Sequence, residues 1–290
     1  MTGLEGVHAA AITPRGKSGE LDFGAAFELI DHLCRGGVNG IFFFGPTGEF
    51  HSFSPEERAR CVKLAVKRSR VPILAGVGAA TLDVSLDLAR DARDADAAAV
   101  VIPPPFFFRY DQDDLRAYFC QFAVEAGNDP PILLWRTSTL AVETALDLWN
   151  GGRFAAIIDA TGDPDAIDRL AAVSVPVFSG LDEGIPHRGR AGVVSPAACA
   201  VPELLVAIER ALNSGAAAEL QALIHRLQEF VRWAARFPEP AAVKLATGLR
   251  GLKTGPLAVP LSPQKQKDLD SFRDWFQTWL PAVRKLAANA

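Results

Sequence analysis

The sequence of 290 residues has no excess of positive charge, because 30 lysines and arginines face 34 aspartates and glutamates. Nucleic-acid binding needs clustered cations, so the net charge of −4 argues against a nucleic-acid partner. The sequence also has no apolar run of the roughly 20 residues that a membrane-spanning helix needs. The longest run, residues 97–108, is interrupted by three prolines. We therefore expect no membrane association.

Cysteine is scarce, and the four cysteines are Cys34, Cys61, Cys120 and Cys199. Their wide spacing fits neither a metal site nor a redox pair, which predicts buried reduced thiols. We expect neither a bound metal nor a cofactor. The first residues show no basic segment followed by an apolar stretch, so we expect no signal peptide and a cytoplasmic protein.

Short apolar runs recur along the first two thirds of the chain, and helical patterns follow most of them. The runs are continuous rather than alternating, as expected of parallel strands that are buried on both faces. Ser54, Pro55 and Glu57 form a strong helix start, and Asp22 and Thr81 can begin two further helices. The eight runs are 7–12, 40–44, 72–76, 97–102, 132–135, 155–158, 175–178 and 191–194.

Eight strands that alternate with helices predict an α/β fold, and within that class a (β/α)8 TIM barrel. A doubly wound parallel sheet is the alternative. After Pro202 the pattern is helical to the end of the chain. We therefore expect the barrel in residues 1–213 and a helical extension, packed on the barrel, in residues 214–290.

Several short motifs occur in the order and spacing of one known family. Together they resemble dihydrodipicolinate synthase and N-acetylneuraminate lyase, and the resemblance covers nearly the whole chain. The motifs are Thr-Pro at 13–14, Gly-Pro-Thr-Gly-Glu at 45–49, Ala-Gly-Val-Gly at 75–78, Pro-Pro-Phe-Phe at 104–107, Ala-Thr-Gly-Asp at 160–163, Ser-Gly-Leu-Asp at 179–182 and Ala-Val-Lys at 242–244.

The resemblance implies a lyase of the aldolase type. Such enzymes condense or cleave 2-keto acids through a Schiff base on a lysine that ends the sixth strand, usually as homotetramers. Here Ile158 stands at the lysine position, and an isoleucine cannot attack a carbonyl. Trp135 and Phe107 stand at two tyrosine positions, and Pro46 stands at a threonine position. Each change removes a hydroxyl that the family uses.

Thr47 and Gly48 remain at the end of the implied site that binds a substrate carboxylate. We therefore predict a protein that has lost Schiff-base aldolase chemistry and binds a small carboxylate through the Thr47 hydroxyl and the Gly48 N–H. The resemblance also implies self-association as a homodimer or homotetramer. The loop after the fifth strand is short, because only seven residues separate Trp135 from Glu143.

Two enzymatic alternatives stay open. The first is a lyase or aldolase that acts on 2-keto acids by an altered, metal-assisted or metal-free mechanism. The second is a Schiff base on a different lysine, and only Lys17 lies in a loop at the catalytic face. Polar residues at the predicted strand ends that would serve the first alternative are Arg136, Asp159, Asp182 and His187.

The same face of the predicted barrel is rich in aromatic residues. Alternation along the second strand would place Phe42 and Phe44 on one side and Phe43 on the other. We expect large side chains of this kind to fill the space that the missing catalytic groups leave. Aromatic residues that stay exposed would instead indicate an interface between subunits.

Overall fold

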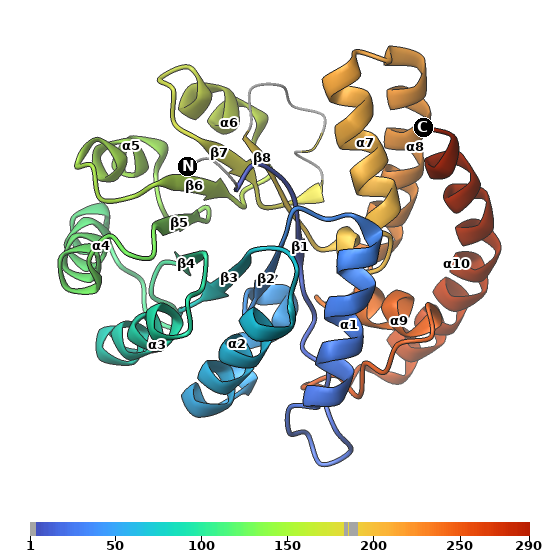
Figure 1. Cartoon of the computed structure of the whole chain (residues 1–290), viewed down its shortest axis with the longest axis horizontal. Coiled ribbons are helices and arrows are strands. Elements are labelled where there is room, and N and C mark those ends of the chain that lie inside the picture. The colour runs from blue at the N-terminus through green and yellow to red at the C-terminus, as the bar shows by residue number, and fades with distance from the viewer. Residues whose placement is uncertain (1–3, 183–184, 186–190) are drawn as a thin grey trace.

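The computed structural model describes residues 4–182, 185 and 191–290. Its strands are β1 (Gly6–Ala10), β2 (Gly40–Phe43), β3 (Ile73–Gly76), β4 (Ala99–Ile102), β5 (Ile132–Arg136), β6 (Ala156–Asp159), β7 (Val177–Ser179) and β8 (Gly192–Ser195). They form a closed parallel barrel in sequence order (Figure 1). Pairing of β1 with β8 closes the barrel, which confirms the TIM-barrel prediction and excludes a doubly wound sheet.

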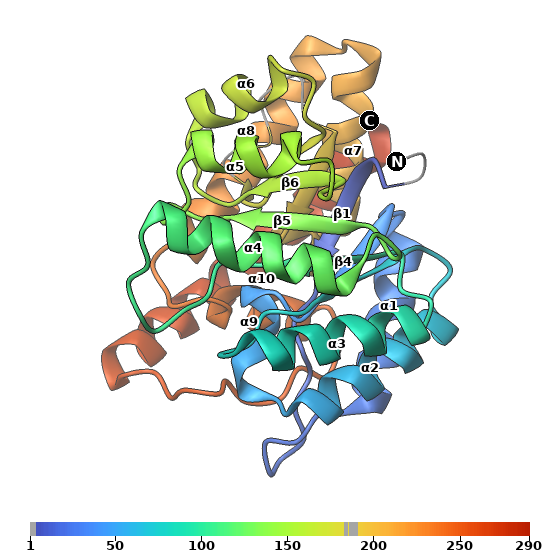
Figure 2. The same ribbon diagram turned by 90° about the vertical axis from the view of Figure 1, so that its left-hand side faces the viewer.

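Helices cover the outside of the barrel, as the view in Figure 2 shows for the helices beside β4, β5 and β6. One α-helix follows each of β1 to β6, and another follows β8. The helices are α1 (Phe23–Gly36), α2 (Pro55–Arg68), α3 (Leu82–Asp94), α4 (Gln112–Ala126), α5 (Val142–Asn150), α6 (Pro164–Ala171), α7 (Pro202–Ser214), α8 (Ala217–Ala234), α9 (Ala241–Leu249) and α10 (Pro263–Asn289).

The predicted helix starts are confirmed by their capping hydrogen bonds. The Asp22 side chain accepts a hydrogen bond from the backbone N–H of Ala25 at the start of α1. Ser54 and Glu57 form a reciprocal capping box at the start of α2. Such caps satisfy the N–H groups that the first helical turn leaves without partners, so polar side chains fix where these helices begin.

The three C-terminal helices gather on one side of the barrel, beside α7 (Figure 1). Helices α8 and α10 pack on α7, and α9 packs on the one-turn helix η4 (Ala197–Cys199) that follows β8. The extension therefore contacts the end of the barrel strands as well as its outer helices. Within the described ranges, no helix combines the length and apolar character needed to cross a membrane.

Two separate apolar clusters fill the barrel and its surroundings. The larger cluster combines strand residues with helix residues, so it lies between the sheet and the helices. The smaller cluster contains only strand residues and Leu4, which places it inside the barrel. We call it the inner cluster, and its residues are Leu4, Ala10, Phe42, Leu74, Ala99, Val101, Leu133, Trp135, Ala156, Ile158, Phe178 and Val194.

The prediction that Phe42 and Phe44 share one side of β2 was wrong for Phe44. Phe42 belongs to the inner cluster, whereas Phe44 packs in the outer cluster, edge-on against Phe53. The reason is local, because Phe44 has a φ of 61° and so leaves the extended conformation on which strand alternation depends. Phe44 still borders the small cavity at the barrel mouth that is described below.

Candidate functional site

Ile158 lies inside the barrel, on β6, with its side chain fully buried in the inner cluster. Its neighbours across the sheet are Trp135 on β5 and Phe178 on β7. Trp135 stacks on Phe42, with ring centroids 5.5 Å apart and ring planes 28° apart. The middle of the barrel beside Ile158 is therefore apolar and closely packed.

The cavity that Phe42 and Trp135 border at the barrel mouth is small, with a volume of about 30 Å³. Space of this size accommodates about two water molecules, and a keto acid needs more. Large apolar side chains such as Phe42, Phe50 and Trp135 occupy most of this region. The cavity is lined by Phe42, Phe44, Gly45, Pro46, Phe50, Gly76, Gly78, Val101, Pro103 and Trp135.

The turn after β2 holds the two groups that were predicted to bind a carboxylate. It is the one-turn helix η1 (Pro46–Gly48). The buried hydroxyl of Thr47 donates to Glu239 Oε1 at 2.5 Å, and the N–H of Gly48 donates to the carbonyl of Gly45 at 3.0 Å. The Thr13 hydroxyl in turn donates to the carbonyl of Gly48 at 2.7 Å. Both predicted donors thus have an acceptor within the chain.

A buried ion pair, which the sequence did not predict, joins Glu49, the residue directly after this turn, to Lys244. The Lys244 ammonium on α9 donates to Glu49 Oε2 at 2.6 Å and to the carbonyl of Pro256 at 2.8 Å. The N–H of Ala258 donates to the other Glu49 oxygen at 2.8 Å, and Arg15 Nε lies 3.7 Å from Glu49 Oε2. This ion pair fastens the β2 loop to the C-terminal extension.

Burial lowers the pKa of Lys244 from its ordinary value, and the neighbouring Glu49 carboxylate opposes that shift. The Lys244 side chain is only 3% exposed, and that of Glu49 is 5% exposed. Each of these two buried charges is therefore compensated mainly by its partner rather than by water. The sequence contained one indication of this pair, which is a lysine within the otherwise apolar first turns of α9.

Arg136 and Asp159 are paired, as neighbours on β5 and β6. The Asp159 carboxylate also accepts hydrogen bonds from the hydroxyl and the N–H of Thr161, at 2.6 and 3.1 Å. Each residue directly follows an inward-facing side chain, so the pair points away from the inner cluster. The structure brings these two predicted residues together outside the middle of the barrel.

Asp182 follows β7 and binds the end of β8. Its carboxylate oxygens accept hydrogen bonds from the Ser195 hydroxyl at 2.5 Å and from the N–H of Ala197 at 3.0 Å. The predicted His187 lies outside the described residues. Among residues 4–182, 185 and 191–290, no three His, Cys, Asp or Glu side chains are arranged so that they could hold a metal ion.

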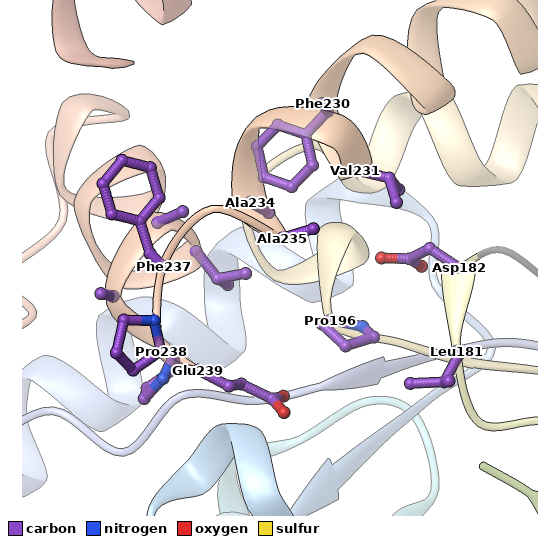
Figure 3. A pocket seen from close by; sticks show the side chains of 14 residues that line it. Leu181, Asp182, Pro196, Phe230, Val231, Ala234, Ala235, Phe237, Pro238 and Glu239 are labelled. Atoms are coloured by element: carbon purple, nitrogen blue, oxygen red, sulfur yellow. The ribbon is translucent and has the colours of Figure 1, made fainter. Parts of the chain in front are cut away.

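Two larger cavities lie between the barrel mouth and the extension, and the sequence did not predict either. The first, of about 170 Å³, is bounded by the loops after β7 and β8 and by α8 and α9 (Figure 3). Its charged lining residues are Asp182 and Glu239, and the rest of the lining is apolar. The second cavity, of about 110 Å³, borders Glu49 and His51. Both are lined by the segment Pro238–Pro240.

All eight lysines of the chain fall within the described ranges, and all but Lys244 are exposed or half-buried. Lys17 is exposed, in the loop after β1. Lys244 is the buried lysine of the described chain, and its ammonium is held by Glu49. The structure therefore describes no primary amine among the side chains that fill the barrel.

The fold and the site define an α/β barrel whose loops at the carboxyl ends of the strands are joined to a C-terminal helical extension. The chain belongs to the dihydrodipicolinate synthetase family, whose model matches residues 3–278. This confirms the family resemblance of the sequence motifs. It also shows that the match includes most of the extension.

Curated relatives named 4-hydroxy-tetrahydrodipicolinate synthase match along most of their length. The chain is 30% identical to that of Bacillus velezensis over 90% of this chain and 94% of the relative. It is 32% identical to the synthase 1 of Streptomyces coelicolor, over 97% and 93% of the two chains. These relatives are named as synthases, and this chain is similar to them.

Solved structures show the same likeness. The 4-hydroxy-tetrahydrodipicolinate synthase of Methylacidiphilum fumariolicum superposes with a TM-score of 0.88 at 26% identity, over 98% of this chain and 99% of that one. The sialic acid aldolase of Ruminococcus gnavus superposes with a TM-score of 0.86 at 17% identity, over 96% and 99%. At 17% identity the second likeness concerns the fold alone.

Proposed function

We propose that this protein is a member of the dihydrodipicolinate synthetase family that has lost Schiff-base aldolase chemistry. The proposal rests on Ile158, which the resemblance of the motifs assigns to the position of the family's lysine and which is buried in the inner cluster. A Schiff base requires a primary amine that reaches the substrate carbonyl. An aliphatic side chain at that place removes the covalent step itself.

The other replacements support the same proposal. The resemblance assigns Trp135 to a tyrosine position, and its indole N–H donates a hydrogen bond but cannot accept one or relay a proton. Phe107 stands at the second tyrosine position and is 83% exposed. Pro46 stands at a threonine position, so it offers neither a hydroxyl nor an N–H. A reaction that moves protons at the substrate would lack its relay groups here.

Trapping with borohydride tests this proposal. The protein is incubated with pyruvate and sodium borohydride, and its intact mass is measured; the Bacillus subtilis relative named 4-hydroxy-tetrahydrodipicolinate synthase is the positive control. We expect no adduct on this protein. A stoichiometric adduct on Lys17, Lys244 or any other lysine would overturn the proposal, and peptide mapping would identify the amine.

We further propose that the mouth still binds a small carboxylate at Thr47 and Gly48. The position of these groups at the carboxyl end of β2 supports the proposal, because barrel ligands bind at that face. A carboxylate that binds only the folded protein raises its melting temperature. A thermal-shift titration with small carboxylates at millimolar concentration tests the proposal, and no shift with any of them would contradict it.

An altered lyase mechanism is the second candidate function, and one observation favours it. The buried Nε of Arg136 has no hydrogen-bond partner in the described structure, although the same guanidinium binds Asp159. Such a group is able to hold a further anion or a substrate oxygen. Turnover of 2-keto acids, with and without added divalent metals, that disappears in Asp159→Asn would support this alternative.

We also propose that the protein self-associates in the cytoplasm. Phe107 and Phe108 support self-association, because they are 83% and 76% exposed in one loop after β4. The four unpaired cysteines fit a reducing compartment. Sedimentation analysis should show a dimer or tetramer, and Phe107→Ser with Phe108→Ser should weaken it; a wild-type monomer at micromolar concentration would contradict the proposal.

A further inference from the structure

Glu239 places a carboxylate of the chain itself on the hydroxyl that the proposed function assigns to a ligand. The two residues are 192 positions apart, and Thr47 Oγ1 donates to Glu239 Oε1 at 2.5 Å. We infer that Glu239 acts as an internal ligand that competes with external carboxylates for the Thr47 hydroxyl. This inference rests on the proposed carboxylate site and describes how its occupancy is controlled.

The donor side of this contact is rigid. Thr47 is buried in the one-turn helix η1, which the Thr13 hydroxyl holds through the carbonyl of Gly48. Gly48 is packed against the end of β1, since an added Cβ would lie 3.1 Å from the carbonyl oxygen of Ala11. The hydroxyl therefore stays in place whether or not Glu239 occupies it.

The acceptor, Glu239, has a fixed backbone and an exposed side chain. Pro238 and Pro240 fix the backbone on both sides of Glu239, and the Ala241 N–H donates to the carbonyl of Pro238. The Glu239 residue itself is exposed. Its side chain can therefore turn away from Thr47 while the backbone of the segment stays fixed.

Charge makes the two occupants exclude each other. A carboxylate beside Glu239 would share one donor with it and would be repelled at short range. A ligand acid must therefore displace the Glu239 side chain. The apparent affinity of the acid is its intrinsic affinity multiplied by the fraction of molecules in which Glu239 has left Thr47. Because the internal carboxylate is tethered, its effective concentration at Thr47 is high.

The adjoining cavity indicates which acids fit. Glu239 borders the cavity of about 170 Å³, whose walls come from residues such as Leu181, Phe230 and Phe237 (Figure 3). An engineered apolar cavity of about 150 Å³ is large enough for benzene. Asp182 lies on the same lining, so an apolar group rather than a second anionic group should extend toward it. The chemical class is therefore a monocarboxylate with an apolar body.

Calorimetric titration of the full chain with acetate and with benzoate tests this inference. Glu239→Ala should bind both acids at least about tenfold more tightly than the wild type, and benzoate more tightly than acetate. Glu239→Gln keeps the length and one acceptor oxygen but removes the charge, so it should gain only part of that affinity.

Two further variants, made in the Glu239→Ala protein, show that the gain depends on the hydroxyl. Thr47→Val should abolish the gain, whereas Thr47→Ser, which keeps a hydroxyl, should retain it. The unfolding midpoint of each variant shows that it is folded.

Equal dissociation constants for wild type and Glu239→Ala would overturn the inference and leave the proposed carboxylate site standing. If neither protein binds either acid, the inference and the carboxylate site both fail. The proposed loss of Schiff-base chemistry is tested separately, because only a borohydride adduct with pyruvate overturns it.

Discussion

The indole of Trp135 lies against the ring of Phe42 inside the barrel, with their centroids 5.5 Å apart. These rings come from β5 and β2, so they meet across the interior of the barrel rather than along one strand pair. Together with Ile158 they belong to the apolar inner cluster, whose Phe178 also contacts the buried ring of His8 edge-on, with centroids 5.7 Å apart. The apolar character of this region leads to the first prediction.

Ile158→Lys should lower the free energy of unfolding by about 4 kcal/mol at pH 7, because a buried lysine without a partner charge has a strongly lowered pKa. Chemical denaturation measures the loss. Ile158→Met is the matched control and should cost less than about 1.5 kcal/mol. The lysine variant should show no useful aldolase activity, since relay hydroxyls remain absent at Pro46, Phe107 and Trp135; rapid turnover would show that relay groups exist elsewhere.

The buried ion pair of Glu49 and Lys244 gives the second prediction. Glu49→Ala leaves the Lys244 ammonium uncompensated, and removal of one partner of a buried pair costs about 3–5 kcal/mol. The double variant Glu49→Gln with Lys244→Met should be more stable than Glu49→Ala, because both charges are removed together. Denaturation midpoints of the three proteins measure this order. A Glu49→Ala protein as stable as the wild type would show that water solvates the Lys244 ammonium and would contradict this prediction.

The third prediction concerns the stability at acidic pH. Burial and the nearby Arg250 lower the pKa of His32 from 6.5 to about 4. Between these values the unfolded chain binds the proton more readily, so the contribution of His32 is complete above pH 6.5 and is lost as the pH falls toward 4. We expect a loss of about 2 kcal/mol over this range, after allowance for partial solvent contact.

His32→Gln should flatten the curve of unfolding free energy against pH between 6.5 and 4. His225→Gln is the control, because His225 is exposed on α8. Equal slopes for wild type and His32→Gln would contradict the assignment. His8 is buried in β1 with a lowered pKa as well, so part of the slope should remain in the variant.

Thiol reactivity gives the fourth prediction. Burial raises the pKa of Cys61 to about 12 and that of Cys199 to about 11, whereas Cys120 is exposed on α4. Because the thiolate is the reactive form, iodoacetamide should modify Cys120 rapidly in the folded protein. Cys61 and Cys199 should react only after unfolding. Peptide mass mapping over time measures the order, and early modification of Cys199 would indicate local opening near η4.

The sequence predicted the strands and helix starts because their causes are local. Continuous apolar runs marked the eight strands, and Ser54 with Glu57 marked a helix start through groups three residues apart. The apolar filling near Ile158 followed from the same information, since the substituted residues are themselves large and apolar. Local pattern failed at Phe44, whose positive φ ends the alternation of β2.

The contacts that control the mouth were not predictable in this way. Lys244 reaches Glu49 across 195 positions, and Glu239 reaches Thr47 across 192. No periodicity in the sequence relates such residues, because their distance in space depends on how the extension packs against the barrel. The outward direction of Arg136 and Asp159 was predictable from alternation with Trp135 and Ile158, but their pairing depended on the strand register.

The tie between Glu49 and Lys244 has a consequence for the integrity of the molecule. A chain cut near residue 214 would keep every strand of the barrel, yet it would leave Glu49 without its ammonium partner and without the N–H of Ala258. The barrel and the helices beyond it are thus mutually dependent. Heat or denaturant should melt them in a single cooperative step rather than one after the other.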